Sequence, residues 1–518
     1  MNMAGSDPLA SIASTREPGA DYVRGSTLIL LGKTVSQGVE FGLQIFLVRY
    51  FSKSDFGAIA YALSIVFLLR AVALFEMPLA LARFIPAYRH RARGDLVLGG
   101  VALGLALVAA LGTAIAAGIA IGVGLFGLHP TSDDEALRVL LVLAALVPID
   151  ALDILVTSLF ATLVGARQIF IRQGIVGPAL RIALVIAVVV TNAGVLAFAA
   201  GYVATSAATL VVYGVMFLNT LRRDASLQPV HRLPLSYPAR ETLTFAAPLL
   251  ASTLVWLLLD SSDAILLGLF HDMDEVAKFR AVVPLAVATQ GVMLAFTVLY
   301  APTLARHVAR GDGDAVTELY WRSALWVTLA SFPLFVLTFS FAPTTTTLVL
   351  GSGYESSSTI LAVLALGYFF HVALGFNGLT LRVLGKVRYS VAIDLAAAVF
   401  NVGINLLLIP AWGALGAAVG TAGTLVLHNI LKQAGLWFYA RVPPLAATYR
   451  APYITVLVVS GGLAAAASVL PHAFWIAAVS SAVAGLSVAW INRRRLGLAG
   501  TFPELARWPL IGKAATSP

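Results

Sequence analysis

Charged side chains inside long apolar runs are the residues of this sequence best placed to do chemistry. Arg70 lies in the middle of YALSIVFLLRAVALF, far from both ends of the run. An ionisable group in hydrocarbon is costly unless it meets water, an opposite charge or a ligand. Arg70 cannot easily extend its guanidinium to a membrane surface, so we interpret it as a contact for an anionic ligand. An internal ion pair with Glu40 or Glu76 is the alternative.

Two pairs of polar residues have spacings that place each pair on one face of a helix. Asp260 and Asp263 are three residues apart in WLLLDSSDAILLGLF, and Asn401 and Asn405 are four apart in VFNVGINLLL. Paired carboxylates in lipid favour a proton or cation site, because one of them must share a proton or meet a cation. The amide oxygens suit a hard cation, although asparagine also caps backbone groups.

Further basic residues lie within the apolar runs or at their ends. The candidate contacts for an anionic headgroup are Arg70, Lys33, Arg49, Arg181, Arg280 and Arg322. Lys33, Arg181 and Arg322 lie closer to run ends, where a long side chain can instead reach the membrane surface. His371 and His428 have no partner at metal-ligand spacing, so we expect them to pack in the interior.

The composition requires a lipid environment for these residues. The chain has 518 residues, of which 59% are hydrophobic and 11% charged, whereas soluble domains have about 25% charged residues. Apolar runs recur from Gly25 to Trp490, and each can cross about 30 Å of hydrocarbon as a helix. The absence of cysteine excludes disulfides and thiolate sites from this sequence. We therefore expect an all-α polytopic membrane protein whose first span is retained, because the first twenty residues are polar.

Hydropathy and helix breakers place about fourteen spans, and the loops between them alternate in charge. One set, including 83–95, 165–172, 221–240 and 305–312, is rich in arginine. The other set, including 129–135, 270–275 and 344–358, is neutral or acidic. Because basic loops stay in the cytoplasm, this alternation predicts that both termini are cytoplasmic.

The sequence also contains an internal repeat. A shift of about 219 residues aligns NAGVLAFAAGYVAT (192–205) with WGALGAAVGTAGT (412–424). Each copy holds six spans, so the copies have the same orientation and form two lobes around a central cavity, as in alternating-access transporters. The expected layout is an N-terminal tail (1–24), an N-lobe (25–220), a linker (221–241), a C-lobe (242–440), two extra spans (451–492) and a C-terminal tail (493–518).

Several long segments resemble a known family. They are FLVRYFSKSDFGAIAYALSIVFLLRAVALFEMPLALARFIPAY (46–88), DAILLGLF (263–270), VAKFRAVVPLA (276–286), LVLGSGYESSSTILAVLALGYFF (348–370) and VLGKVRYSVAIDLAAAVFNVGINLLLIPAWGALGAAVGTA (383–422). Together they resemble the polysaccharide flippases of the multidrug/oligosaccharidyl-lipid/polysaccharide exporter superfamily. The resemblance extends over about residues 25–440.

This resemblance implies a flippase of the bacterial inner membrane. Its substrate would be a polyprenyl-diphosphate-linked oligosaccharide destined for capsule, exopolysaccharide or O-antigen, and the diphosphate would give Arg70 an anionic partner. The related lipid II flippases have an arginine and an aspartate in the first span, where this chain has Leu43 and Gln44. That difference argues against lipid II as the substrate. By the same resemblance, the last two spans would shelter the lipid tail.

The resemblance also implies a coupling cation. Asp263, Asn401, Asn405 and Thr421 match the sodium ligands of the lipid II flippases, although Asn405 replaces an acid. Sodium coupling is one expectation, and proton coupling through Asp260 or Asp263 is the other. We expect no other metal or cofactor. The expected partners are the lipid-linked oligosaccharide, the bilayer, a glycan polymerase and export machinery. We expect a monomer that binds no nucleic acid.

Two other functions remain as alternatives. A membrane glycosyltransferase or ligase would need a large outer loop with acidic or basic residues, and the outer loops here are short, so we do not expect an enzyme. A multidrug/organic-cation antiporter of the same superfamily usually has twelve spans and a cavity suited to cations. The arginine in the second span favours an anionic substrate.

Overall fold

The computed structural model of this protein describes residues 18–126, 131, 133–163, 166–223, 234–467, 469 and 473–496. Side chains are described for all of these except residues 18–30, 125, 166, 167, 256, 260 and 494. Within this part of the chain the regular structure is helical and contains no strand. The expected all-α membrane fold is confirmed.

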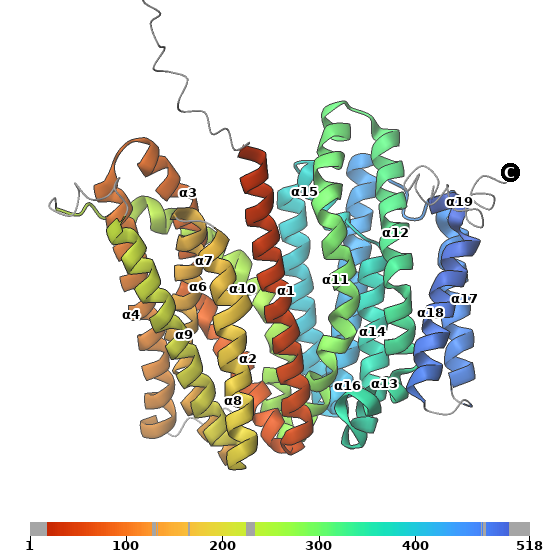
Figure 1. Ribbon diagram of the computed structural model, residues 1–518. Coiled ribbons are helices and arrows are strands. Elements are labelled where there is room, and N and C mark those ends of the chain that lie inside the picture. Colours follow the sequence, from red (N-terminus) through yellow and green to blue (C-terminus); the bar gives the residue numbers. More distant parts are fainter. Residues whose placement is uncertain are drawn as a thin grey trace, which may run out of the picture.

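The N-terminal group of helices is on the left of Figure 1. It comprises α1 (Pro18–Tyr50), α2 (Lys53–Leu74), α3 (Met77–His90), α4 (Gly94–Phe126), α5 (Asp134–Leu143), α6 (Leu146–Leu163), α7 (Ala166–Phe170), the π-helix η1 (Ile171–Val176), α8 (Gly177–Thr191) and α9 (Val195–Arg223).

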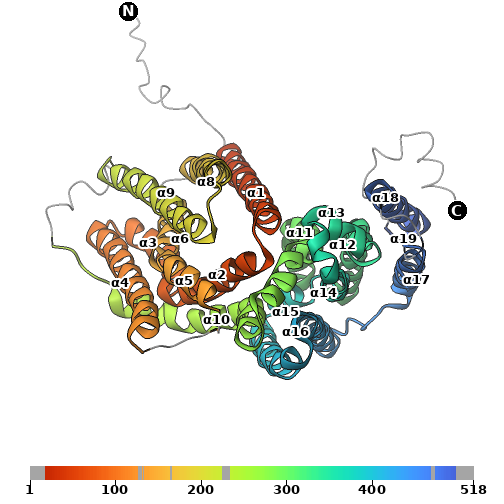
Figure 2. The ribbon, with the colours of Figure 1, turned by 90° about the horizontal axis from the view of Figure 1, so that it is seen from below.

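The C-terminal group follows, with α17 and α18 at the outer edge in Figure 2. It comprises α10 (Ala239–Phe270), α11 (Met273–Ala309), α12 (Gly313–Phe339), α13 (Ala342–Leu350), η3 (Ser352–Ser357), α14 (Ser358–Ala373), α15 (Asn377–Val383), α16 (Val387–Ala440), η4 (Ala447–Tyr449), α17 (Arg450–Ala467), α18 (Phe474–Ile491) and α19 (Arg493–Leu496).

Twelve helical segments of the described chain are long and apolar enough to cross a membrane. One of them, α16, has 54 residues, which at 1.5 Å per residue is more than two bilayer crossings. It bends back at Gly413, where φ is 53° and ψ is −132°. The helix α1 is not among the twelve. The number of fourteen spans therefore stays a prediction.

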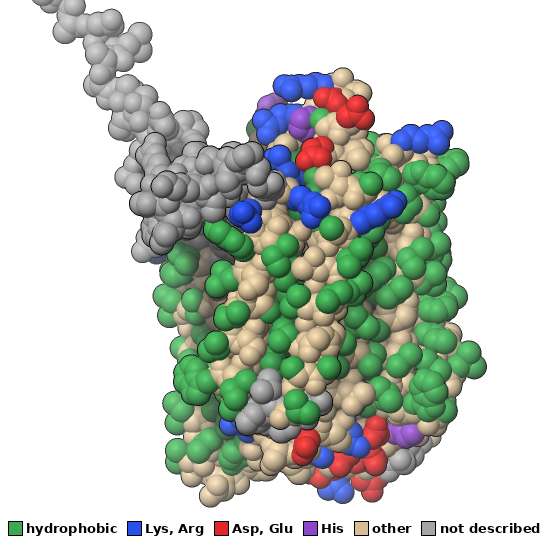
Figure 3. Space-filling view, turned by 90° about the vertical axis from the view of Figure 1, so that its right-hand side faces the viewer, with side chains coloured by type: hydrophobic (Ala, Val, Ile, Leu, Met, Phe, Trp, Pro, Cys, Tyr) green, Lys and Arg blue, Asp and Glu red, His purple; other side chains and the backbone are tan. Residues whose placement is uncertain are grey.

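Charged side chains gather at the two ends of the molecule, with hydrophobic side chains between them on the face shown in Figure 3. The turn before α4, the turn before α12 and the turn before α16 lie at the upper end in Figure 1, which we call the basic end. The turns before α9, α11 and α14 lie at the lower, acidic end. Helix α1 begins at the basic end and runs to the acidic end, and α19 lies at the basic end (Figure 1).

Several expected loops are partly helical, and two of them are helical over most of their length. Residues 344–358 form most of α13 and the 3₁₀ helix η3. Residues 166–172 form α7 and the start of η1. Both stretches are short and mixed in polarity, so hydropathy alone did not distinguish them from loops.

The two groups of helices share one hydrophobic cluster near the acidic end. Phe56 and Ile59 of α2 belong to the same cluster as Met273 and Val276 of α11 and Ala414 of α16. A second cluster lies within the C-terminal group and joins α17 and α18 to α12. The N-terminal and C-terminal groups are therefore packed together near the acidic end.

Glycines allow the closest helix crossings. A Cβ on Gly57 would lie 1.9 Å from the carbonyl oxygen of Met273, so α2 and α11 meet backbone to backbone. A Cβ on Gly367 of α14 would lie 2.6 Å from the Cα of Ala422 in α16. By contrast, nothing lies within 4 Å of the Cβ position of Gly423. Small residues at such crossings allow membrane helices to pack tightly.

We predict that Gly367→Ala lowers the stability of the folded protein by about 1–3 kcal/mol, because the added methyl group overpacks the α14–α16 crossing. Gly423→Ala, one residue from the same crossing, is the matched control and has room for its methyl group. Thermal unfolding of the detergent-purified proteins measures the difference. Equal melting temperatures for the two variants would contradict the described crossing.

Candidate functional site

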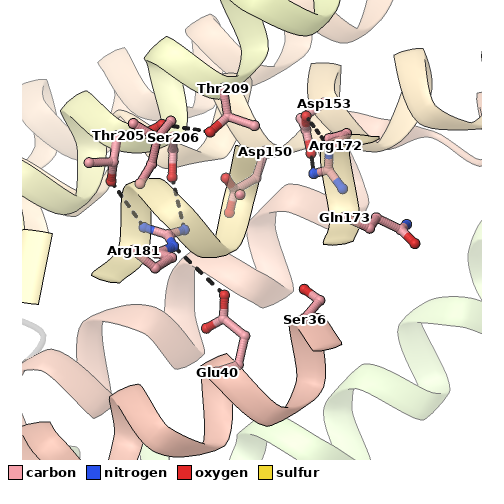
Figure 4. Close-up of a pocket in the computed structure, with 12 residues that line it drawn as sticks. Ser36, Glu40, Asp150, Asp153, Arg172, Gln173, Arg181, Thr205, Ser206 and Thr209 are labelled. Atoms are coloured by element: carbon pink, nitrogen blue, oxygen red, sulfur yellow. Dashed lines mark hydrogen bonds and ion pairs between the residues drawn. The ribbon is translucent and has the colours of Figure 1, made fainter. Parts of the chain in front are cut away.

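A polar cavity of about 90 Å³ lies inside the N-terminal group, among α1, α6, η1, α8 and α9 (Figure 4). A volume of this size holds several water molecules. Its charged and polar lining includes Ser36, Glu40, Asp150, Asp153, Arg172, Gln173, Arg181, Thr205, Ser206 and Thr209. We use the name N-terminal charge cluster for Glu40, Arg70, Asp150, Asp153, Arg172 and Arg181.

Arg172 makes the tightest ion pair of this cluster. Its Nε lies 3.0 Å from Oδ1 of Asp153, and its Nη2 contacts the other carboxylate oxygen. This two-pronged geometry is the strong form of an arginine–carboxylate pair. Asp153 is buried, so the guanidinium supplies the charge that it needs in the membrane.

The sequence placed Arg172 in a loop, and the structure contradicts this. The residue lies in the π-helix η1, whose wider turn is a feature often found at functional sites. A Cβ on Gly174 would lie 3.4 Å from the Cα of Gly32, so η1 packs closely on α1.

Arg181 is a predicted site residue that the structure places in the cluster. Nη1 donates to Oγ1 of Thr205 at 3.3 Å, and Nη2 donates to Oγ of Ser206 at 3.1 Å. Its Nε is 3.7 Å from Oε1 of Glu40, whose side chain is half exposed. The guanidinium also stacks over the ring of Tyr202. Neutral hydroxyl groups therefore hold Arg181 more closely than its carboxylate does.

Arg70 pairs with Asp150, and the expected alternative partners Glu40 and Glu76 are wrong. Nη1 of Arg70 is 3.6 Å from Oδ2 of Asp150, and the arginine side chain is 26% exposed. Helix α2 ends at Leu74, and the next two residues adopt positive φ angles. That turn carries Glu76 away from the helix face of Arg70. Glu76 instead accepts a hydrogen bond from Oγ1 of Thr253 in α10.

The N-terminal charge cluster contains three arginines and three carboxylates, so its formal charge is zero. The three pairs differ in closeness: Arg172 is within hydrogen-bond distance of its acid, whereas Arg70 and Arg181 are 3.6 and 3.7 Å away from theirs. A longer distance between the charged atoms weakens their attraction. Arg70 and Arg181 are therefore the guanidinium groups most able to exchange a carboxylate for another anion.

Arg49 and Arg280 join the two groups of helices. Nε of Arg49 donates to the carbonyl of Val349 at 2.9 Å, and its Nη2 donates to the carbonyl of Leu348, near the end of α13. Nη2 of Arg280, in α11, donates to Oγ of Ser64 in α2 at 2.7 Å. A cation near the C-terminal end of a helix also interacts favourably with the helix dipole.

Lys33 and Arg322 lie outside both of these arrangements. The side chain of Lys33 is exposed on α1, and that of Arg322 is exposed on α12 in the other group of helices. Among the six predicted basic contacts, the structure thus brings only Arg70 and Arg181 together in the charge cluster. Arg322 is excluded because it belongs to the C-terminal group. Its spacing along the chain carries no information about its distance in space from the charge cluster.

A second polar site lies in the C-terminal group, where all four predicted cation ligands meet. Oγ1 of Thr421 donates to Oδ2 of Asp263 at 2.7 Å, and Nδ2 of Asn405 donates to Oδ1 of the same carboxylate. Nδ2 of Asn405 is also 3.3 Å from Oδ1 of Asn401. The bend at Gly413 makes this possible, because it folds the second half of α16 back beside the first. We call these four residues the Asp263 cluster.

The Asp263 cluster has the donor set of a hard-cation site. Oδ1 of Asn405 is buried and has no hydrogen-bond partner within the described part of the chain. A Cβ on Gly420 would lie only 2.0 Å from this oxygen, so the glycine leaves room for the Asn405 side chain. Carboxylate, amide and hydroxyl oxygens are the ligands that hard cations prefer. The N–H of Asn405 and the O–H of Thr421 donate hydrogen bonds to the carboxylate of Asp263 but do not neutralise its charge.

The other cation-site predictions have mixed outcomes. The amide of Asn401 donates to Oγ1 of Thr424 at 3.2 Å, so it bonds a side chain and does not cap a helix. The side chain of Asp260 lies outside the described residues, and its pairing with Asp263 stays a prediction. No group of three or more His, Cys, Asp or Glu suited to a metal occurs in the described chain.

Comparisons with known proteins support a transporter fold. The sequence pattern of the family described as polysaccharide biosynthesis protein matches residues 22–308, which is more than half of the 518-residue chain. No curated protein matches the sequence significantly. Among solved structures, the fold is similar to the lipid II flippase MurJ in an inward closed conformation. The TM-score is 0.69 and the identity 12%, over 92% of this chain and 99% of that chain.

The fold is also similar to multidrug transporters. A multidrug resistance MATE family transporter of the MOP superfamily, in an inward-facing conformation, matches with a TM-score of 0.63 and 15% identity, over 80% of this chain and 98% of that chain. A point mutant of a MATE protein matches with a TM-score of 0.52 and 17% identity, over 82% and 96% of the two chains. At these identities the likeness establishes a common fold.

We predict that Arg172→Met lowers stability by about 3–5 kcal/mol, because it leaves buried Asp153 without a counter-charge. The double variant Arg172→Met/Asp153→Leu should recover most of that loss. Arg70→Met should change stability by about 1 kcal/mol or less, since the pair is loose and Asp150 also faces other arginines. Thermal unfolding in detergent measures all three variants. A double variant no more stable than Arg172→Met would rule out a structural ion pair.

Proposed function

Because the chain belongs to the polysaccharide biosynthesis protein family, we propose that it is a flippase for a polyprenyl-diphosphate-linked oligosaccharide. It acts by alternating access in a bacterial inner membrane, as a transporter and not as an enzyme. The glycan is destined for capsule, exopolysaccharide or O-antigen. The basic end faces the cytoplasm, because short loops rich in arginine stay on that side.

The observation that carries this proposal is the pair of loosely held guanidinium groups on Arg70 and Arg181. A diphosphate offers several oxygens that match the paired donors of a guanidinium. The diphosphate replaces Asp150 as the partner of Arg70 and Glu40 as the partner of Arg181. The released carboxylates turn to water in the adjoining cavity. The six residues of the N-terminal charge cluster have no net charge without substrate. When substrate binds, the same residues exchange a carboxylate for a phosphate.

The contacts near the acidic end supply the closed outer gate of this cycle. Gly57 lies against Met273, Arg49 donates to the end of α13, and Arg280 donates to Ser64. All three contacts join the N-terminal and C-terminal groups, so they must break before a substrate leaves on the outer side. We therefore assign Arg49 and Arg280 to this gate.

The Asp263 cluster holds the coupling cation, and sodium is the ion that we propose. One carboxylate beside two amides and a hydroxyl gives the oxygen set for a monovalent hard cation. The buried, unpaired Oδ1 of Asn405 supports this, because an oxygen that lacks a donor is stabilised by a cation.

A multidrug antiporter is the second candidate. Glu40 is half exposed beside the cavity, and a carboxylate in that position suits an organic cation. The fold likeness to MATE transporters fits this function as well as it fits a flippase. The two candidates differ in which members of the N-terminal charge cluster touch the substrate.

We predict that Arg70→Ala and Arg181→Ala each reduce glycan export by about 10- to 100-fold, which corresponds to the loss of a charge-assisted hydrogen bond of about 1.5–3 kcal/mol. The measurement is complementation of a deletion strain, with surface glycan and accumulated lipid-linked intermediates quantified. Arg322→Ala is the matched control, since its exposed side chain lies in the other group of helices. Membrane levels of each variant are compared on immunoblots.

Normal export by both folded arginine variants would contradict the flippase proposal. Resistance to organic cations in a drug-susceptible strain, lost in Glu40→Gln but kept in Arg70→Ala, would establish the antiporter instead.

We predict that sodium stabilises the purified protein and that Asp263→Asn abolishes this effect. A ligand at about 100 times its Kd adds about 2.7 kcal/mol to the stability of the folded state. Melting temperatures in sodium chloride and choline chloride give the measurement. Ser331→Ala is the control, because Ser331 is buried and its hydroxyl donates to the carbonyls of Val327 and Thr328 in its own helix. An equal sodium shift in Asp263→Asn would exclude this cluster as the site.

A further inference from the structure

A third polar cluster lies between the two halves of α16, outside both sites described above. Oδ1 of Asp394 accepts a hydrogen bond from Nε2 of His428 at 2.8 Å and another from Nζ of Lys432 at 2.8 Å. All three side chains are buried. His428 is buried, as expected from the sequence, and its ring also contacts a carboxylate. We call these three residues the Asp394 cluster.

The Asp394 cluster is in register with the Asp263 cluster. Asp394 precedes Asn401 by seven residues in the first half of α16, and His428 follows Thr421 by seven residues in the second half. Seven residues are two helical turns, or about 10 Å. Both halves of α16 therefore place the Asp394 cluster about 10 Å nearer the basic end than the cation ligands.

The helices that pack against α16 carry several charged or titratable neighbours of the cluster. His371 of α14 is an electrostatic neighbour of His428 and Lys432, and it is hydrogen-bonded to Asn429. Arg382 of α15 is an electrostatic neighbour of Lys432. On α10 the described carboxylates are those of Glu241, in its first turn, and Asp263. Helix α11 meets α16 through Glu275 at Ala414, near the opposite end.

The composition of the cluster separates it from a simple structural ion pair. Lys432 alone already balances the charge of Asp394, so a neutral His428 leaves the cluster with no net charge. Histidine is the side chain that takes up a proton near neutral pH, and its proton would give this buried cluster a charge of +1. Gly378 of α15 covers the ammonium, because a Cβ there would lie 2.9 Å from Nζ of Lys432.

We infer that the Asp394 cluster is a proton-binding site and that a proton held there weakens cation binding at the Asp263 cluster. This coupling rests on the proposed sodium site. The two positive charges are about 10 Å apart, and at an effective dielectric constant of about 20 their repulsion lowers the cation affinity roughly tenfold, or about 1.4 kcal/mol. Coupling between binding sites is reciprocal, so sodium weakens proton binding at the Asp394 cluster by the same factor.

The test compares sodium affinity at about pH 5.5 and about pH 8, on either side of the range in which histidine titrates. Radioactive sodium binding is measured on the full-length protein in nanodiscs. His428→Gln keeps a donor for Asp394 but cannot take up a proton, and His371→Gln is the matched control. We expect the ratio of the sodium affinities at the two pH values to fall about tenfold in His428→Gln and to stay unchanged in His371→Gln. An unchanged pH dependence in His428→Gln overturns the coupling.

A second measurement separates failure of the proton site from failure of the sodium site. The chain contains eight histidines, so carbon-labelled histidine gives a small NMR set in which the His428 signal is identified by its loss in His428→Gln. A His428 signal that titrates across this range supports the proton site, and one that does not titrate overturns it. If no variant binds sodium, the sodium proposal and the coupling fail together. The His428 titration then decides the proton site alone. Should His428→Gln fail to fold, His428→Asn takes its place.

Discussion

The cost of holding a charge in hydrocarbon is the constraint on which this structure depends. Within the described helices, Arg172 faces Asp153, Arg181 faces Glu40, and Lys432 faces Asp394. Each of these contacts joins residues from different helices or from the two halves of α16. The polar contacts therefore help to determine which helices are neighbours, in addition to providing the sites. Apolar packing alone cannot do this as specifically, because lipid tails compete equally well for apolar surface.

Three polar clusters follow from this constraint, and two of them, the N-terminal charge cluster and the Asp263 cluster, are the proposed binding centres, one in each group of helices. The N-terminal centre contains guanidinium groups that can accept an anion, whereas the C-terminal centre contains a carboxylate beside neutral oxygens. The contacts between Gly57 and Met273 and between Arg49 and α13 hold the two groups together near the acidic end. The fold is similar both to a lipid II flippase and to MATE transporters, so the fold alone does not distinguish the two proposed functions.

The sequence predicted the helical membrane fold, and its family resemblance implied the four residues of the Asp263 cluster as one ligand set. The bend of α16 at Gly413 is what brings Thr421 back beside Asn401 and Asn405. The partner of Arg70 was not predictable, since α6, which carries Asp150, is far away in sequence. The place of Arg172 was missed for a different reason. A π-helical turn has no hydropathy pattern of its own, so the polar stretch before Gly174 read as a loop.

In the proposed transport cycle, Arg70 and Arg181 exchange their carboxylates for a diphosphate. A cryo-electron microscopy structure of the protein bound to a short-chain polyprenyl-diphosphate sugar would show this exchange. We expect phosphate oxygens within hydrogen-bond distance of both guanidinium groups, with Arg172 still paired to Asp153. A diphosphate bound elsewhere, with the Arg70–Asp150 and Arg181–Glu40 pairs unchanged, would contradict it.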